Sequence, residues 1–317
     1  FQMPEKLIPS NSIRARFCAA MSQMYRQEVP LYGTLVDMVQ TINRQQLETQ
    51  PELRLELENT QSFQRLSTER HGAIRLGLAQ ELSTLRRLFA VMGMYPVSYY
   101  DLSEAGIPVH STAFRPLTAD ELNTNPFRIF TSLLRLDLIP SEKLRIKAET
   151  LLQQRQIFTE RAIQLVEIAE SQHGLNDEQA TEFVEQALHT FRWHRQATVD
   201  IETYRDFLAA HQLIADIVCF KGPHINHLTP RTLNIDLAQQ QMSDYGLPAK
   251  AIIEGPPQRK HPLLLRQTSF RALQEDILFT ELNGESRAGS HSARFGEIEQ
   301  RGMALTPKGR SLYDQLL

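Results

Sequence analysis

The hydrophobic pattern changes character along the chain, and this change constrains the fold more than any other feature. Before residue 212, apolar residues recur at helical spacing in long segments. After it, short apolar or β-branched segments are bounded by Gly and Pro, which is typical of strands. A helix-rich part followed by strand, helix, strand and strand predicts an α+β fold with a large helical insertion.

The individual elements can be placed from the same pattern. Helices are expected over residues 34–47, 78–92, 141–171, 177–191 and 232–245. Gly93 is expected to end the second of them, and Ser141 and Thr232 are expected to cap the third and fifth. Strands are expected over residues 213–220, 251–253, 263–268 and 293–298.

Composition excludes several classes of protein. The 317 residues are 41% hydrophobic and carry a formal charge of −3, so the chain is neither disordered nor strongly attracted to nucleic acid or an anionic membrane. No apolar stretch is long enough to span a membrane, and the N-terminus is not a secretory signal. Cys18 and Cys219 are too few for a disulfide scaffold or a CxxC metal site, so we expect a cytoplasmic protein.

The first segment with chemical potential is ERHGAIR, which contains His71 and Arg75. Residues four apart share one face of a helix or one side of a turn. Gly72 would let another segment approach closely. In a functional interpretation His71 is a metal ligand and Arg75 binds a carboxylate, because a guanidinium pairs with a carboxylate through two parallel hydrogen bonds. The alternative is a histidine at a helix end beside a solvated arginine.

The second segment is KGPHINHLTPR, which contains His224 and His227. A His-x-x-His pair in an extended or turning segment with two prolines indicates a metal site better than a helical histidine does. The odd spacing places the two histidines on opposite faces of a strand, so only one would reach a given metal unless the chain turns. His227 is preferred because Asn226 and Thr229 flank it as supporting hydrogen-bond partners. A loop histidine that caps backbone groups is the alternative.

The third segment is HSARFGEIEQRG, which contains Glu297 and Glu299. In a strand these two carboxylates share one face, and Gly296 and Ile298 share the other. Two inward-facing carboxylates are costly unless they bind a cation or an arginine. The alternative is an edge strand whose glutamates are solvated.

Together the three segments supply two histidines and one carboxylate. That set is the facial triad of non-haem Fe(II) oxygenases, which leaves coordination positions open for substrate and O2. It equally describes a catalytic zinc site. The ligand set alone does not choose between the two metals.

Several longer phrases resemble a known family. They are RHGAIRLG, LFAVMGMYPVSYYDLSEAGIPVHSTAFRP, NPFRIFTSLLRLDLI, GPHINHLTPRT, EGPP, LLLRQTSF and ARFGEIEQRGMALTPKGR. They are similar to the 2-oxoadipate dioxygenase/decarboxylase family, also called 2-hydroxyglutarate synthase and formerly a domain of unknown function. The resemblance spans roughly residues 68–317. The family is related to the vicinal oxygen chelate superfamily, in which paired βαββ-type units curve around a metal.

Carried over by position, the resemblance implies Fe(II) held by His71, His227 and Glu297, with Arg75 bound to a substrate carboxylate. His224 and Glu299 remain the less favoured alternatives. The segment EIEQ is similar to the metal-binding strand of hydroxyphenylpyruvate dioxygenases, in which the glutamate three positions before Gln is the ligand, and this favours Glu297.

The implied reaction is an oxidative decarboxylation followed by hydroxylation. 2-Oxoadipate and O2 would give D-2-hydroxyglutarate and CO2, in lysine catabolism. The implied organisation is an N-terminal helical region over residues 1–65 and a metal-binding α+β catalytic domain over residues 66–317, with a helical insertion at about 120–210. The family's members are longer, so we expect the natural polypeptide to continue past residue 317. The expected partners are a 2-oxo dicarboxylic acid and O2.

Two other functions fit the same residues. One is a zinc-dependent hydrolase or lyase that acts on a small carboxylate. The other is a catalytically inactive binding protein of the same fold. The sequence does not indicate an oligomeric state.

Overall fold

The computed structural model describes residues 6–60, 62–259, 263–300, 302 and 305–316. The chain divides into two compact units. Unit 1 comprises residues 1–30, 68–228 and 272–295, and unit 2 comprises residues 31–67, 229–271 and 296–317. Within the described residues, no helix combines the length and the apolar character that crossing a membrane requires.

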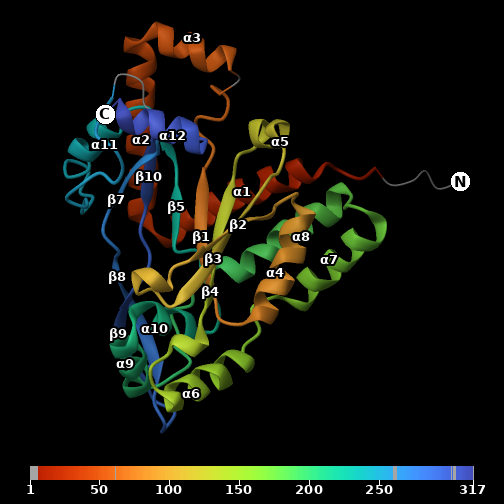
Figure 1. Ribbon diagram of the computed structural model, residues 1–317. Coiled ribbons are helices and arrows are strands. Elements are labelled where there is room, and N and C mark those ends of the chain that lie inside the picture. The colour runs from red at the N-terminus through yellow and green to blue at the C-terminus, as the bar shows by residue number, and fades with distance from the viewer. Residues whose placement is uncertain (1–5, 61, 260–262, 301, 303–304, 317) are drawn as a thin grey trace, which may run out of the picture. The chain divides into compact units, whose positions relative to one another are not determined.

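A five-stranded sheet organises unit 1 (Figure 1). Its strands are β1 (His71–Leu76), β2 (Tyr95–Asp101), β3 (Val109–Arg115), β4 (Arg128–Leu134) and β5 (His227–Thr229). The order across the sheet is β2-β3-β4-β1-β5. β1 and β4 are parallel, whereas β3 is antiparallel to both β2 and β4. The pattern of the first half predicted helices and missed β1 to β4.

Helix α4 (Ala79–Val91) connects β1 to β2 and lies where the sequence predicts a helix. It ends as expected, because Gly93 adopts a φ of +66° that L-residues with a side chain rarely take. Together β1, α4, β2, β3 and β4 form one strand–helix–strand–strand–strand unit. Its first and last strands lie side by side in parallel.

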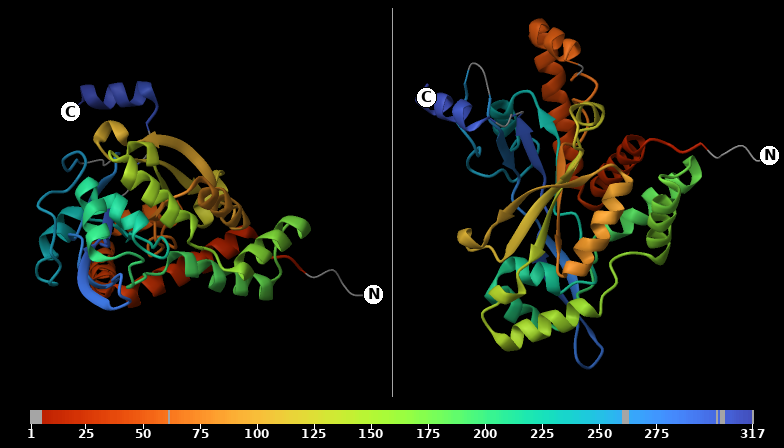
Figure 2. Two further views of the ribbon diagram at one scale, coloured as in Figure 1. Left: turned by 90° about the horizontal axis from the view of Figure 1, so that it is seen from below. Right: turned by 45° about the vertical axis from the view of Figure 1, so that its right-hand side comes forward.

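The other helices of unit 1 occupy the N-terminus and the long connection from β4 to β5. They are α1 (Ser10–Glu28), α5 (Ala119–Thr124), α6 (Glu142–Gln153), α7 (Glu160–Gln172), α8 (Asp177–Leu188), α9 (Ile201–Ala210) and α10 (Gln212–Val218), with short 3-10 turns at η1 (Ser103–Ala105), η2 (Leu136–Leu138) and η3 (His189–Phe191). Figure 2 shows α7 and α8 side by side next to α4, and α7 contacts both. Unit 1 also contains the hairpin of β8 (Gln274–Thr280) and β9 (Ser286–Ser292).

The single helix predicted over residues 141–171 is two helices. Ser141 caps α6 as expected, but Thr159 starts α7 afresh by accepting a hydrogen bond from the Ala162 amide. The break allows Arg155 to turn inward, where its guanidinium pairs with the buried carboxylate of Glu81 at 2.6 Å. A continuous helix would carry Arg155 past that carboxylate.

The predicted strand over residues 213–220 is wrong, because the segment forms α10. All five residues from Ile214 to Val218 are buried and all but Asp216 are apolar, so the run shows no helical alternation of apolar and polar residues. His211 starts the helix, since its Nδ1 accepts a hydrogen bond from the Leu213 amide at 3.0 Å.

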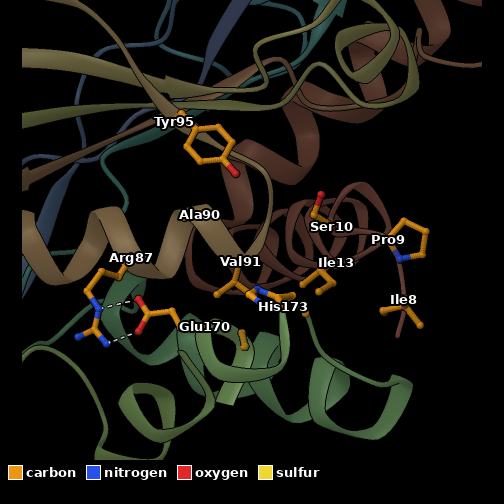
Figure 3. Close-up of a pocket in the computed structure, with 12 residues that line it drawn as sticks. Ile8, Pro9, Ser10, Ile13, Arg87, Ala90, Val91, Tyr95, Glu170 and His173 are labelled. Atoms are coloured by element: carbon orange, nitrogen blue, oxygen red, sulfur yellow. Dashed lines mark hydrogen bonds and ion pairs between the residues drawn. The ribbon is translucent and has the colours of Figure 1, made fainter. Parts of the chain in front are cut away.

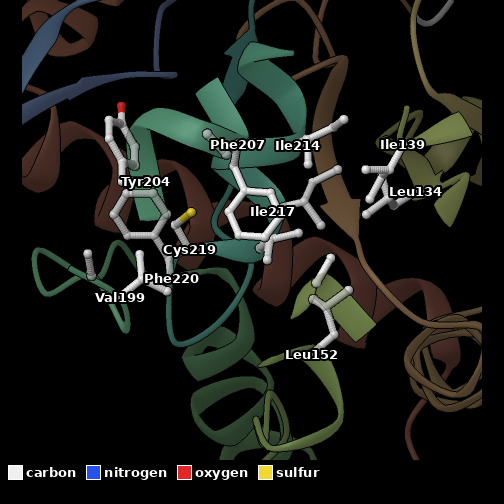
Figure 4. Close-up of a cluster of buried hydrophobic side chains, with 14 of the residues drawn as sticks. Leu134, Ile139, Leu152, Val199, Tyr204, Phe207, Ile214, Ile217, Cys219 and Phe220 are labelled. Carbon is white, nitrogen blue, oxygen red and sulfur yellow. The ribbon is translucent and has the colours of Figure 1, made fainter. Parts of the chain in front are cut away.

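Helix α10 lies in an apolar cluster of unit 1 (Figure 4). The cluster joins α6, α9 and α10 to the hairpin strand β8, through buried residues that include Leu152, Phe207, Ile217, Phe220 and Phe279. Burial of these large side chains contributes roughly 1.5–3 kcal/mol each to folding. The cluster therefore holds α10 in place.

Unit 2 is built on a three-stranded sheet of order β6-β10-β7. Its elements are α2 (Pro30–Thr49), which begins at the last residue of unit 1, α3 (Pro51–Asn59), β6 (Arg231–Thr232), α11 (Ile235–Gln241), β7 (Arg266–Ser269), β10 (Glu297–Gln300) and α12 (Pro307–Gln315). The helix predicted over 34–47 lies within α2. β10 is parallel to β6 and antiparallel to β7.

Four predicted elements in this part of the sequence differ from the structure. The helix expected over 232–245 is shorter and is capped by Asn234, because Thr232 belongs to β6. Residues 251–253 form bends rather than a strand, and Ile252 is 69% exposed. The strands expected over 263–268 and 293–298 are β7 and β10, each displaced toward the C-terminus.

A buried arginine ties the N-terminal helix to unit 1. Arg14 of α1 has no exposed surface, and its guanidinium donates to three backbone carbonyls. The acceptors are Met92 at 2.8 Å, Glu121 at 3.1 Å and Asn125 at 3.2 Å. The Met92 and Asn125 carbonyls follow the ends of α4 and α5, where the helix provides no donor for them.

Replacing Arg14 should therefore destabilise unit 1. Arg14→Met removes three buried donors, so we expect the free energy of unfolding to fall by about 3 kcal/mol and the thermal midpoint by roughly 6 to 12 °C. Arg16→Met, two residues along the same helix, breaks an exposed ion pair with Asp177 and exposed hydrogen bonds to Thr181 and the Asp177 carbonyl, and it should change stability by less than about 0.5 kcal/mol. Equal effects of the two variants in thermal unfolding would show that the Arg14 bonds contribute nothing specific.

Candidate metal centre

His71 and Arg75 lie on one face of strand β1. The sequence places them together on a helix or turn, and their even spacing also puts them on one side of a strand. The opposite face presents Ile74 and Leu76, which are fully buried. The apolar face packs β1 into unit 1 and leaves the His71 face for chemistry.

Gly72 allows β5 and the residues just before it to approach β1 closely. A Cβ at Gly72 would lie 2.9 Å from the side chains of both Ile225 and Leu228, so no other residue fits without displacing them. The Asn226 amide donates to the Ala73 carbonyl at 2.8 Å in the same contact. The close approach expected at Gly72 is confirmed.

The contact brings two imidazole rings together. The ring centroids of His71 and His227 lie 5.5 Å apart with perpendicular planes. Phe295 stacks on His227 at 4.7 Å, and Phe130 of β4 meets the His71 ring edge-on at 5.3 Å. The aromatic neighbours restrict how either imidazole can rotate.

Glu297 begins strand β10 of unit 2 and is 8% exposed. The Thr229 hydroxyl donates to its Oε1 at 3.1 Å, so Thr229 supports Glu297, whereas the sequence predicted that it would support His227. Ile298 points to the other face and is fully buried, so the alternation read from the sequence is confirmed. Gly296 immediately precedes the strand, and a Cβ at this position would lie 2.6 Å from the Phe270 ring.

His71, His227 and Glu297 each offer a ligand atom, and these three atoms lie within 4.8 Å of one another. His71 and Glu297 are buried and His227 is partly buried. A buried carboxylate is costly to hold ionised without a compensating cation, and two imidazoles beside it complete a common set of metal ligands. The group could therefore hold a divalent metal ion, and iron and zinc both suit it.

The alternative ligand His224 does not belong to this group. It is 3% exposed, and its Nε2 lies 2.9 Å from Oδ1 of Asp216. Glu299 lies on β10, opposite Arg231 and Gln267 in the sheet register, and is not in the group either.

Arg75 forms an ion pair rather than standing alone. Its Nη1 lies 2.7 Å from Oδ2 of Asp216, and its side chain is 22% exposed. Burial raises the pKa of the Asp216 carboxyl, but attraction to His224 and hydrogen bonds from His224 and His291 outweigh it and hold that pKa well below its usual range. The Asp216 carboxylate is therefore ionised at neutral pH.

The sequence analysis missed Asp216, which sits in the segment predicted as a strand. A signal was available, because Asp216 is the one charged residue in the apolar run LIADIVCF. A carboxylate in such a run must find donors when the run is buried.

A hollow of about 410 Å³ in unit 1 lies elsewhere (Figure 3). Its lining includes Arg87, Glu170, Tyr95 and His173, and none of the three grouped residues takes part. The Arg87 guanidinium is already paired with the Glu170 carboxylate through two hydrogen bonds of 2.7 and 2.8 Å. This hollow therefore lacks the available cation that recognition of a carboxylate requires.

Comparison with known proteins identifies relatives at high identity. The chain is 61% identical over 310 residues to a 2-oxoadipate dioxygenase/decarboxylase of Escherichia coli, covering 98% of this chain and 68% of that protein. The crystal structure of a Pseudomonas putida hydroxyglutarate synthase in complex with 2-oxoadipate matches with a TM-score of 0.93 and 57% identity, covering 99% of this chain and 69% of that one.

A more distant structure shows the fold alone. A putative glyoxalase superfamily protein from Ralstonia eutropha matches with a TM-score of 0.61 at 17% identity, covering 85% of this chain and 83% of that one. The α+β, vicinal-oxygen-chelate-like fold expected from the sequence is thereby confirmed. The family model described as 2-oxoadipate dioxygenase/decarboxylase matches residues 17–317. On this evidence, the chain belongs to the 2-oxoadipate dioxygenase/decarboxylase family.

Proposed function

We propose that the chain is an Fe(II)-dependent dioxygenase that converts 2-oxoadipate and O2 to D-2-hydroxyglutarate and CO2. The observation that carries the proposal is the grouping of His71, His227 and Glu297 within 4.8 Å in a member of this family. The bound 2-oxoadipate in the Pseudomonas putida relative supports the choice of substrate. Atoms balance, because one CO2 leaves while the five-carbon product retains the remaining oxygens.

The three grouped residues would hold the iron. Two neutral imidazoles and one carboxylate leave coordination positions for other ligands, and their burial reduces competition from water. Fe(II) bound there would supply the redox chemistry that a reaction with O2 requires. The Thr229 hydroxyl orients Glu297 through one carboxylate oxygen, while Phe295 and Phe130 hold the two imidazole rings.

Arg75 would bind the substrate carboxylate that lies farther from the 2-oxo group. Arg75 is on the same face of β1 as His71, and the four residues of strand from position 71 to position 75 span about 13 Å along the backbone. A guanidinium fixed at this position orients the dianion, so that its 2-oxo end faces the metal.

The cytoplasm remains the expected compartment. Cys18 and Cys219 are both free thiols and both buried, and burial raises the pKa of each above its usual range. Free, protonated thiols are what a reducing compartment favours.

Oxygen uptake tests the proposal directly. Addition of 2-oxoadipate to the Fe(II)-loaded protein should consume one O2 for each 2-hydroxyglutarate formed. Oxygen uptake with a different 2-oxo acid, and not with 2-oxoadipate, would show that the reaction type is correct and the substrate is another 2-oxo acid. Metal-dependent turnover without O2 would indicate the zinc hydrolase or lyase, and bound metal with no turnover of any 2-oxo acid would indicate an inactive binding protein.

Substitution of the grouped residues should remove the metal. His71→Ala, His227→Ala and Glu297→Ala should each lower bound iron by at least tenfold, as measured by metal analysis after dialysis, with the circular dichroism spectrum unchanged. Glu299→Gln and His224→Gln are matched controls from the same two segments and should retain the metal. Full iron in His227→Ala, together with loss in His224→Gln, would assign the ligand to His224 instead.

Arg75→Lys should separate metal binding from substrate binding. A lysine keeps the positive charge but cannot form two parallel hydrogen bonds with a carboxylate. We expect full iron content and a fall in kcat/KM for 2-oxoadipate on the order of 100-fold, about 2.7 kcal/mol in transition-state stabilisation. Unchanged kinetics would exclude Arg75 as the carboxylate-binding residue.

A further inference from the structure

Asp216 is a buried hub of unit 1 whose two carboxylate oxygens accept from four side chains. Oδ1 accepts from Nε2 of His224 and from Nε2 of His291, each at 2.9 Å. Oδ2 accepts from Nη1 of Arg75 at 2.7 Å and from Nδ2 of Asn226 at 3.4 Å. Asp216 is 4% exposed, so these donors replace water.

The ion pair creates a difficulty for Arg75 as an anion receptor. A guanidinium paired with one carboxylate has no net charge in the pair, and a neutral pair attracts a second carboxylate weakly. Recognition of a dianion by Arg75 therefore requires a further positive charge near Asp216. The two histidines are the candidates, and their hydrogen bonds distinguish them.

His224 has an acceptor at each ring nitrogen. Nε2 faces the Asp216 carboxylate, and Nδ1 faces the carbonyl of Ile225 at 3.2 Å. Neither a carboxylate nor a carbonyl oxygen can donate. An imidazolium at His224 would satisfy both contacts, whereas a neutral imidazole would leave one ring nitrogen without a proton facing an acceptor.

His291 has a different pair of neighbours. Its Nε2 donates to Asp216, but its Nδ1 lies 2.8 Å from the hydroxyl of Tyr204, which can donate. Burial raises the pKa of Tyr204 to about 12, so the hydroxyl keeps its proton at neutral pH. A neutral His291 satisfies both bonds.

We propose that Asp216 and His224 are positioning residues for Arg75: Asp216 anchors one guanidinium nitrogen, and His224 cancels the carboxylate charge so that Arg75 retains a net positive charge for a substrate carboxylate. The inference deepens the proposed function and rests on it. It assigns to a histidine outside the metal group the task of keeping the site selective for dicarboxylates.

Trp193 offers a direct readout. It is the one tryptophan of the chain, and its ring lies 4.7 Å from the ring of His224, 6.2 Å from that of His291 and 4.4 Å from the guanidinium carbon of Arg294. Its fluorescence therefore reports on the Asp216 cluster itself.

The test compares two acids that differ in one carboxylate. Binding of 2-oxoadipate and of 2-oxohexanoate to the Fe(II)-loaded protein is followed under argon by Trp193 fluorescence, so no turnover is needed. His224→Gln should weaken 2-oxoadipate binding by about tenfold and leave 2-oxohexanoate binding unchanged, because only the former presents the distal carboxylate to Arg75.

His291→Gln is the matched control. It removes an equally buried hydrogen bond to the same oxygen of Asp216 but removes no charge, so the ratio of the two affinities should stay within about twofold of the original. A purely structural role for the cluster predicts equal losses in His224→Gln and His291→Gln, and for both acids. That result would overturn the inference, as would an unsubstituted protein that binds the two acids equally.

A second measurement uses the unsubstituted protein, so it does not depend on whether a variant folds. In protein labelled with ¹⁵N-histidine, both ring nitrogens of His224 should appear protonated at neutral pH, whereas His291 should show one protonated and one unprotonated nitrogen. A neutral His224 would overturn the inference. Failure of the proposed function is seen separately, as no oxygen uptake by the unsubstituted protein.

Discussion

The close contact between β1 and the segment before β5 is the constraint on which the rest of the site depends. It exists because position 72 has no side chain, so Ile225 and Leu228 pack directly on the strand. The main-chain bond from Asn226 to Ala73 fixes the register. With that register set, His71 and His227 come within 5.5 Å between ring centres, and each is backed by an aromatic ring.

Two buried carboxylates, Asp216 of unit 1 and Glu297 of unit 2, have different surroundings. Asp216 receives two imidazoles, a guanidinium and an amide, so the protein itself compensates its charge. Glu297 lies instead in a group with His71 and His227, a set that a divalent cation would complete. The surroundings of each carboxylate, rather than its residue type, decide which one is suited to bind a metal.

The site was more predictable from sequence than the secondary structure was. Residues four apart lie on one side of a helix and also on one side of a strand. His71 and Arg75 were therefore correctly predicted to share a face, although the segment is a strand and not a helix or turn. The odd spacing of His224 and His227 correctly indicated that they face different partners. Which of the two belongs with Glu297 followed from the family resemblance and from the flanking Asn226 and Thr229.

The prediction of secondary structure failed where complete burial removes the helical alternation of apolar and polar residues. Seven of the eight residues over 213–220 are apolar, and a short buried helix with a single polar residue resembles a buried strand in sequence. The break after α6 was hidden for a different reason. After the break, Arg155 pairs with the distant carboxylate of Glu81, a contact that no local pattern reveals.

The same burial that hid α10 gives Asp216 its proposed task. A carboxylate on an exposed helix would be solvated, and Arg75 would then interact with it weakly. Enclosed among apolar side chains, Asp216 must be satisfied by fixed donors, and these donors hold Arg75 in one orientation. Because the enclosed Asp216 carboxylate cancels the charge of Arg75, a second cation is needed to restore a net positive charge. We assign that role to His224, whose two ring nitrogens each face an acceptor. Under this proposal, the apolar packing around α10 would contribute to substrate selection through the net charge at Arg75, without contact between the apolar side chains and the substrate.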